Sequence, residues 1–284
     1  MKPSPFDYAR ATSLTEALAL LERHGEKAQI LAGGQTLIAT LNMRLSAPDW
    51  LIDITRIPGL SGVSLTDTHL VIGALTTHRE IERSALVAQH APLLTQAAPH
   101  IAHAAIRNSG TIGGSIAFAD PAAEWPACCV ALDAQIVIRA LSGERRASAR
   151  TYFRGLYDTD RASNEIITAI EIPRETPPRR SVFMELARRH GDYAIVGLAL
   201  LGRVAEGRLS DVAIGYVGAG ATPLLARGAM AALEGQVPGA DVLERAKAAL
   251  TQDLDPSGDL YNSPATKRHL AAVLLERAVK QLLA

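Results

Sequence analysis

The chain has 284 residues, of which 48% are hydrophobic and 20% are charged. This composition is typical of a globular protein and excludes a disordered one. Lysine plus arginine and aspartate plus glutamate both number 29, so the net charge is zero and does not attract nucleic acid or an anionic membrane. Aromatic residues make up only 4% of the chain, which also argues against a surface that stacks bases.

The N-terminal residues 1–8 contain no apolar signal-peptide core, and no run of about 18 apolar residues occurs in the chain. We therefore expect a cytoplasmic protein without a membrane span. Its two cysteines, Cys128 and Cys129, are adjacent in an apolar helical run and are expected to be buried free thiols. Two cysteines are too few to hold an iron–sulfur cluster or a cysteine-based zinc site, which need about three or four ligands.

The first part of the chain reads as alternating helices and strands. Ser13 is a plausible N-cap, with Glu16 at the third helical position, for a helix that ends near Gly25. The elements expected after it are a strand at 29–32, a helix at 36–44, a strand at 50–54, a hairpin of 63–65 with 69–73, helices at 77–90 and 92–102, a glycine-rich segment at 110–120, a helix opening at 125–127, and strands at 134–139 and 165–172.

The proline-rich, charged segment 173–180 is the best candidate for a domain boundary. Strands are expected after it at 181–188, 194–204 and 209–218, followed by helices at 226–234 and 239–250 and an amphipathic last helix with Leu270, Val273, Leu274, Ala278 and Leu282 on one side. We therefore predict an α+β protein with a first domain at 1–175, divided into subdomains 1–57 and 58–175, and an α+β C-terminal domain at 179–284.

Two glycine pairs stand out as possible anion-binding bends. In Leu31-Ala32-Gly33-Gly34-Gln35-Thr36-Leu37, a strand is followed by a double glycine, two hydrogen-bonding side chains and a helix start. Glycines let backbone N–H groups turn toward one point, and a helix start adds partial positive charge, which suits a pyrophosphate. A tight strand-to-helix turn without a ligand is the alternative.

The second pair lies in Gly110-Thr111-Ile112-Gly113-Gly114-Ser115, and acidic residues follow it at Asp120 and Glu124. A carboxylate there could accept hydrogen bonds from ribose hydroxyls, although a loop capped by Asp120-Pro121 is an equally good interpretation. Neither bend has the Gly-x-Gly-x-x-Gly or the P-loop pattern. Gly218-Ala219-Gly220 is interpreted as an ordinary turn because Pro223 interrupts any immediate helix.

The sequences Ala-Gly-Gly-Gln-Thr-Leu (32–37) and Ile-Arg-Asn-Ser-Gly-Thr-Ile-Gly-Gly-Ser (106–115) together closely resemble the FAD-binding subunit of the molybdenum hydroxylases, a family that includes carbon monoxide dehydrogenase and the flavin domain of xanthine dehydrogenase. The resemblance continues through 120–127, 165–167, 191–194 and 217–220 and covers essentially the whole chain. It implies the two-subdomain FAD-binding fold of the vanillyl-alcohol oxidase type, followed by the family's smaller C-terminal α+β domain.

The resemblance also implies where the cofactor binds. Residues 32–36 and 111–115 would wrap the FAD pyrophosphate, Glu124 would replace the usual aspartate near a polar part of FAD, and Tyr193 would lie near the flavin ring. His78 is a weaker candidate. The residues assigned to the cofactor are Ala32, Gly33, Gly34, Gln35, Thr36, Leu37, Ile101, Ala102, Gly110, Thr111, Ile112, Gly113, Gly114, Ser115, Asp120, Glu124, Ile167 and Tyr193.

In such enzymes a molybdenum centre oxidises the substrate, and two [2Fe–2S] clusters carry the electrons to FAD. Because this chain has only two cysteines, the clusters and the molybdopterin are expected on a small and a large partner subunit. No catalytic acid or base and no metal ligand is assigned to this chain, and His100 with His103 is not interpreted as a metal site. The stretch 183–186 lacks a long basic side chain that some relatives carry near the flavin, which leaves the electron acceptor open.

Two other functions remain as alternatives. The chain could be a flavin oxidase that acts alone on a small alcohol or amine, although its C-terminal hundred residues look too small for a substrate domain. It could also be a non-catalytic FAD-binding assembly factor of a redox complex. Reduction of the bound flavin by partner subunits would separate the assembly factor from the electron-transfer subunit.

Overall fold

The computed structural model describes residues 2–284. The N-terminal part forms a parallel sheet in the order β1-β3-β2, from β1 (Asp7–Arg10), β2 (Ala28–Leu31) and β3 (Trp50–Asp53). Helix α1 (Leu14–His24) buries Ala17, Leu18 and Leu21, and its N-cap Ser13 accepts a hydrogen bond from the Glu16 N–H as expected. Because β2 ends at Leu31, the first glycine bend and helix α2 (Leu37–Asn42) follow at the carboxyl edge of this sheet.

A five-stranded antiparallel sheet forms the second part of the molecule, in the order β4-β5-β10-β6-β7. Its strands are β4 (Val63–Leu65), β5 (His69–Gly73), β6 (Gln135–Ala140), β7 (Gly143–Ser148) and β10 (Ile166–Pro173). The predicted hairpin of β4 with β5 is confirmed. Strand β7 was missed because Gly143-Glu144-Arg145-Arg146 lacks apolar alternation, and its pairing with β6 rather than its own sequence makes it a strand.

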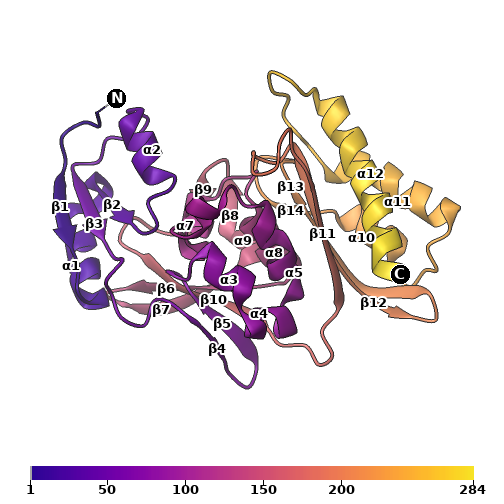
Figure 1. Cartoon of the computed structure of the whole chain (residues 1–284), viewed down its shortest axis with the longest axis horizontal. Coiled ribbons are helices and arrows are strands. Elements are labelled where there is room, and N and C mark those ends of the chain that lie inside the picture. Colours follow the sequence, from indigo (N-terminus) through magenta and orange to yellow (C-terminus); the bar gives the residue numbers. More distant parts are fainter. Residues whose placement is uncertain (1) are drawn as a thin grey trace.

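Short helices cover this sheet (Figure 1). They are α3 (His78–Arg83), α4 (Ala85–His90), α5 (Pro92–Ala97), the 3₁₀ turn η2 (Ala98–His100), α6 (Ala104–Arg107), α7 (Ile112–Phe118), α8 (Glu124–Ala131) and α9 (Ala149–Tyr152). A small hairpin of β8 (Phe153–Gly155) and β9 (Asp158–Thr159) follows. A second 3₁₀ turn, η1 (Gly25–Lys27), lies between α1 and β2.

Two of the predicted helices in this region differ from the structure. The single helix expected at 77–90 is two helices, because Ser84 ends α3 and its hydroxyl accepts a hydrogen bond from the Val87 N–H at 3.3 Å, which begins α4. The next helix stops at Ala97 instead of continuing to 102. Within the glycine-rich segment 110–120, Thr111 caps the helix α7.

The C-terminal part has strands first and helices after them, as predicted. Its sheet has the order β11-β12-β13-β14, from β11 (Arg180–Leu186), β12 (Val196–Ala205), β13 (Arg208–Val217) and β14 (Leu224–Leu225). The helices are α10 (Arg227–Leu233), α11 (Ala240–Asp253) and α12 (Pro264–Leu283).

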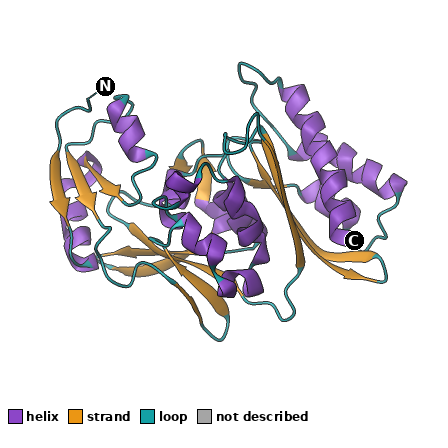
Figure 2. Ribbon diagram, in the orientation of Figure 1, coloured by secondary structure: helices purple, strands orange, loops and turns teal. Residues whose placement is uncertain are grey.

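Helices pack on both faces of this last sheet (Figures 1 and 2). Helices α10 and α12 contact one face, and α5 and α8 from the preceding part contact the other. Burial on both faces explains why every residue from Val196 to Leu201 is apolar or glycine. The buried stripe of α12 is Ala271, Leu274, Leu275, Ala278, Val279 and Leu282, so the predicted Leu270 and Val273 lie at its edge.

The longest helix, α12, spans 20 residues, and neither it nor any other helix within residues 2–284 has the apolar length that a membrane crossing requires.

Candidate functional site

A cavity of about 840 Å³ opens between the N-terminal part and the second part of the chain. One wall is formed by residues of α1, β2 and the bend before α2, and the opposite wall by the segments near 74–78, 101–124 and 161–167. The loop 191–193, which leads into the C-terminal sheet, closes one side. This volume is within the usual range of small-molecule and cofactor sites.

The first glycine bend presents free backbone donors to this cavity. Gly34 has a φ of +71°, a left-handed conformation that a side chain rarely adopts, and the Gln35 amide steadies the bend by donating to the Gly33 carbonyl at 3.1 Å. Within residues 2–284, no hydrogen bond is donated by the N–H groups of Gly33, Gly34, Gln35 or Thr36. Unpaired N–H groups in the wall of a cavity suit an anionic ligand.

The second bend is held more tightly by the protein itself. The Gly110 carbonyl accepts a hydrogen bond from the His78 N–H at 2.9 Å, and the Ile112 N–H donates to the Thr76 carbonyl at 3.1 Å. The Thr111 hydroxyl then caps α7 by accepting from the Gly114 N–H at 3.1 Å. These contacts fix the backbone of the bend against the segment 76–78.

The two bends touch each other in the tertiary structure. A Cβ atom added to Gly33 would lie 2.9 Å from the Gly110 Cα and would overlap the Ser109 carbonyl. A Cβ atom added to Gly110 would lie 2.7 Å from Nε2 of His78. Both positions therefore require glycine, and together the bends form one continuous backbone cradle at the cavity wall.

Two acidic residues line the same cavity. Asp120 makes the predicted turn, because its Oδ1 accepts a hydrogen bond from the Ala122 N–H at 2.9 Å, and burial raises the pKa of its carboxyl. Glu124 is only 8% exposed, and burial raises the pKa of its carboxyl to about 7, with a contribution from the charge of Asp120. A ligand hydroxyl that donated a hydrogen bond to either carboxyl would offset part of this burial cost.

Glu185 of β11 extends this acidic group toward the C-terminal sheet. Its Oε2 is buried and has no hydrogen-bond partner among the described residues. Burial and the neighbouring Glu124 carboxyl raise the pKa of Glu185 to about 8. Tyr193 also lines the cavity, with 73% of its surface exposed, so its ring is available at the edge of the site.

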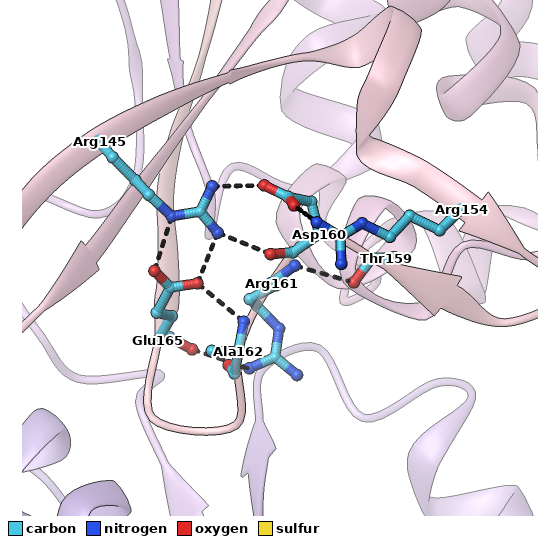
Figure 3. Close-up of polar contacts among 7 residues, drawn as sticks. All are labelled: Arg145, Arg154, Thr159, Asp160, Arg161, Ala162 and Glu165. Atoms are coloured by element: carbon cyan, nitrogen blue, oxygen red, sulfur yellow. Dashed lines mark hydrogen bonds and ion pairs between the residues drawn. The ribbon is translucent and has the colours of Figure 1, made fainter.

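An ion-pair network positions the loop that carries Arg161, a lining residue that the sequence analysis missed (Figure 3). Arg145 of β7 donates two hydrogen bonds of 2.7 Å to the Glu165 carboxylate, one of 2.5 Å to the Asp160 carboxylate and one of 2.7 Å to the Asp160 carbonyl. Arg154 pairs with the same aspartate. Arg161 donates to the carbonyl oxygens of Ala162 and Glu165, which holds its guanidinium beside the cavity. No signal in the sequence separates Arg161 from an ordinary solvated arginine, because only this fold brings the loop to the site.

The cavity gathers almost all of the predicted site residues. Those that line it are Ala32, Gly33, Gly34, Gln35, Thr36, Leu37, Ile101, Ala102, Gly110, Thr111, Gly113, Gly114, Ser115, Asp120, Glu124, Ile167, Tyr193 and the weaker candidate His78. Ile112 does not line it, because its side chain points into the core and is fully buried. Other residues that were not predicted also line the cavity, among them Ser163, Ile166 and Phe118.

Two other expectations concern metals and thiols. No group of three or more potential metal ligands occurs among residues 2–284. Cys128 and Cys129 are buried free thiols in α8, as expected. Both belong to the helix that starts at Glu124, so they lie in the packed core behind the cavity wall.

Comparison with known families gives two matches that cover most of the chain. Residues 4–175 match the FAD-binding domain in molybdopterin dehydrogenase, and residues 181–282 match the CO dehydrogenase flavoprotein C-terminal domain. The free donors of the first bend and the glycine cradle fit the diphosphate that such a domain binds.

Individual proteins agree with the family matches. The chain is 37% identical over 284 residues to the 6-hydroxypseudooxynicotine dehydrogenase complex subunit alpha of Paenarthrobacter nicotinovorans, covering 100% of this chain and 96% of that protein. It is 33% identical over 279 residues to the carbon monoxide dehydrogenase medium chain of Hydrogenophaga pseudoflava, covering 98% and 97%. The reconstituted CO dehydrogenase from Oligotropha carboxidovorans contains a chain that superposes with a TM-score of 0.97 at 34% identity, covering 100% of this chain and 99% of that one. The predicted fold class is confirmed, and the chain belongs to the family of FAD-binding subunits of molybdopterin dehydrogenases.

Proposed function

We propose that this chain binds FAD in the cavity between its two glycine bends and relays electrons within a molybdenum hydroxylase. The observation that carries the proposal is the contact of Gly33 with Gly110, which joins two bends from different parts of the sequence into one cradle beside free N–H donors. A single turn of this kind is common in proteins, whereas two that meet at one large cavity suit an elongated dinucleotide.

The chain's own residues would bind and orient the cofactor. The N–H groups of residues 33–36 would donate to the diphosphate, with Thr111 and Ser115 beside it on the second bend. The carboxyls of Asp120 and Glu124 would accept hydrogen bonds from hydroxyl groups of the ribose or ribityl chain. Ile101, Ala102 and Ile167 would supply apolar contacts, and exposed Tyr193 would lie near the flavin ring.

Bound FAD accepts electrons one at a time and releases two together, so it can connect one-electron iron–sulfur clusters to a two-electron acceptor. We infer that the electrons come from a small [2Fe–2S] subunit and originate at a large molybdopterin subunit. The only two cysteines of this chain are buried in α8 and cannot ligate a cluster at its surface. The chain would pass the electrons to an external acceptor at the exposed side of the flavin.

The test starts from the full chain, purified alone and together with the proteins encoded beside it. We expect about one FAD for each copy of this chain after acid release. Anaerobic addition of carbon monoxide, an aldehyde or an N-heterocycle to the complex should bleach the iron–sulfur absorbance first and the flavin absorbance afterwards. A complex from which FAD has been removed should show only the bleaching of the iron–sulfur absorbance.

Each alternative gives a different result. Direct bleaching of the flavin in the isolated chain by a small alcohol or amine would indicate a flavin oxidase. Bound flavin that no partner reduces would indicate an assembly factor. Absence of FAD from both the chain and the complex would contradict the proposal as a whole.

A further inference from the structure

A buried hydrogen bond between two side chains sets the protonation state of an imidazole at the cavity wall. Trp125 of α8 is fully buried, and His78, the first residue of α3, is 6% exposed. The indole Nε1–H of Trp125 donates to Nδ1 of His78 at 2.9 Å. An indole nitrogen is a donor only, so Nδ1 must act as the acceptor, and the proton of the neutral imidazole therefore lies on Nε2.

The opposite edge of the His78 ring faces the second glycine bend. His78 lines the cavity, and its Nε2 lies 2.7 Å from the position that a Cβ atom of Gly110 would take. Within residues 2–284, no side chain or carbonyl accepts a hydrogen bond from this Nε2. The glycine thus leaves room for the imidazole edge, and the Nε2–H remains free for a ligand.

The surroundings of His78 disfavour the charged imidazolium. Burial, together with the smaller effect of the positive charge of Arg107 on α6, lowers the pKa of His78 to about 4. Arg107 is itself paired with Glu82 of α3 at 3.1 Å. The other charged or titratable groups on α3 and on the elements that contact it are Arg79, Glu80, Arg83, His90, His100, and Glu124 beside Trp125.

We propose that Trp125 holds His78 in the Nε2–H tautomer, so that His78 is a neutral hydrogen-bond donor to the diphosphate in the cradle. This inference rests on the proposed FAD site. His78 is the residue that contacts the cofactor, and Trp125 is a positioning residue that acts through it. A neutral donor avoids the cost of burying a charged imidazolium, and the bond from the indole prevents the other tautomer, whose Nε2 lone pair would face the phosphate oxygens.

The proposal predicts an unusual pH dependence when the indole donor is removed. In Trp125→Phe, His78 can place its proton on Nδ1, so near pH 8 its Nε2 lone pair would repel the phosphate. Near pH 4.5, close to the lowered pKa of His78 of about 4, the imidazolium would form and would again present a proton at Nε2. The variant should therefore bind FAD weakly at high pH and recover affinity as the pH falls.

The experiment measures FAD dissociation constants of the full chain, or of its complex where the complex is needed for binding. We expect about a tenfold weaker affinity for His78→Leu and a smaller loss for His78→Gln, whose amide can still donate near the Nε2 position. Trp125→Phe should lose about tenfold near pH 8 and much less near pH 4.5. Trp50→Phe, at the other tryptophan, which stacks on His24 away from the cavity, is the matched control.

The affinity of each variant is divided by that of the unchanged protein at the same pH. This ratio removes any effect of Glu124, whose carboxyl titrates in the variants and in the unchanged protein alike. Equal affinity ratios for Trp125→Phe at the two pH values would contradict the inference, as would equal losses for His78→Gln and His78→Leu. If Trp125→Phe does not fold, the inference is tested by the two His78 variants and by the ¹⁵N spectrum of the His78 ring. That spectrum shows which ring nitrogen carries the proton. Failure of the unchanged protein to bind FAD would contradict the proposed function itself.

Discussion

Gly33 lies in a loop of the three-stranded sheet and Gly110 in a loop of the five-stranded sheet. Their backbones are nevertheless packed so closely that a Cβ atom on Gly33 would lie 2.9 Å from the Gly110 Cα. This contact joins the N-terminal part of the chain to the second part at the wall of the cavity. The geometry of the site therefore depends on the absence of a side chain at both positions.

Substitution Gly33→Ala tests this dependence. The new methyl group would overlap the Ser109 carbonyl, which is backbone and cannot rotate away, so the bends must separate. We expect FAD affinity to fall about tenfold or more, a free energy of about 1.4 kcal/mol, measured by titration and by released flavin. Gly155→Ala is the matched control, because its nearest neighbour would be the Asp158 Cβ at 3.7 Å. Unchanged affinity of Gly33→Ala would show that the bends are not a single cradle.

Arg145→Gln tests the ion-pair network beneath the Arg161 loop. Removal of the guanidinium leaves the Glu165 carboxylate, 9% exposed, without its bidentate partner. We expect the free energy of unfolding to fall by about 2 kcal/mol and FAD affinity to weaken, because Arg161 and Ile166 would shift. Arg146→Gln on the same strand breaks a more exposed pair with Glu171 and should cost about 0–1 kcal/mol. Equal losses in urea unfolding for the two variants would contradict a special role for Arg145.

The raised pKa values of Glu124 and Glu185 predict how stability varies with pH. Burial raises these carboxyl pKa values from 4.5 to about 7 and about 8, so the folded chain binds protons that the unfolded chain releases above pH 4.5. The contribution of these carboxyls to stability is therefore present below pH 4.5 and decreases as the pH rises toward about 8, by at most about 1.4 kcal/mol per pH unit for each carboxyl. Glu185→Gln should flatten this decline and raise the melting temperature at pH 8.

Glu206→Gln, in the exposed turn between β12 and β13, is the control for this measurement. Melting curves between pH 5 and pH 8 compare the three proteins. A decline in Glu185→Gln as steep as that of the unchanged chain would show that this carboxyl is ionised and solvated instead of protonated in the folded state.

The adjacent cysteines should be unreactive while the chain is folded. Both thiols are fully buried, and burial raises the pKa of Cys129 to about 12 and that of Cys128 well above its usual value. Because the thiolate is the reactive form, we expect no rapid reaction with a disulfide reagent at pH 8 and the release of two thiols per chain on unfolding. Fast labelling of the native chain would indicate an accessible cysteine. Fewer than two thiols after unfolding without a reducing agent would indicate a disulfide.

Sequence patterns located most elements because their signals are local. Ser13 followed by Glu16 marks the start of α1, and the alternating residues of β5 and β10 mark buried strands. Patterns failed where a partner decides the structure. Strand β7 carries charges on both faces and forms only because β6 offers it an edge, and Ser84 divides a continuous helical pattern by capping the next helix.

The sequence by itself determined the two glycine bends, the family resemblance and the residues that could reach an anion, since these depend on residue type and on neighbours along the chain. Only the tertiary structure decided that Gly33 meets Gly110, that Trp125 bonds His78, that Glu185 approaches Glu124, and that Ile112 points into the core. The physical reason is that these contacts join residues far apart in the sequence. Their geometry follows from how the sheets and helices pack, which no short stretch of the chain encodes.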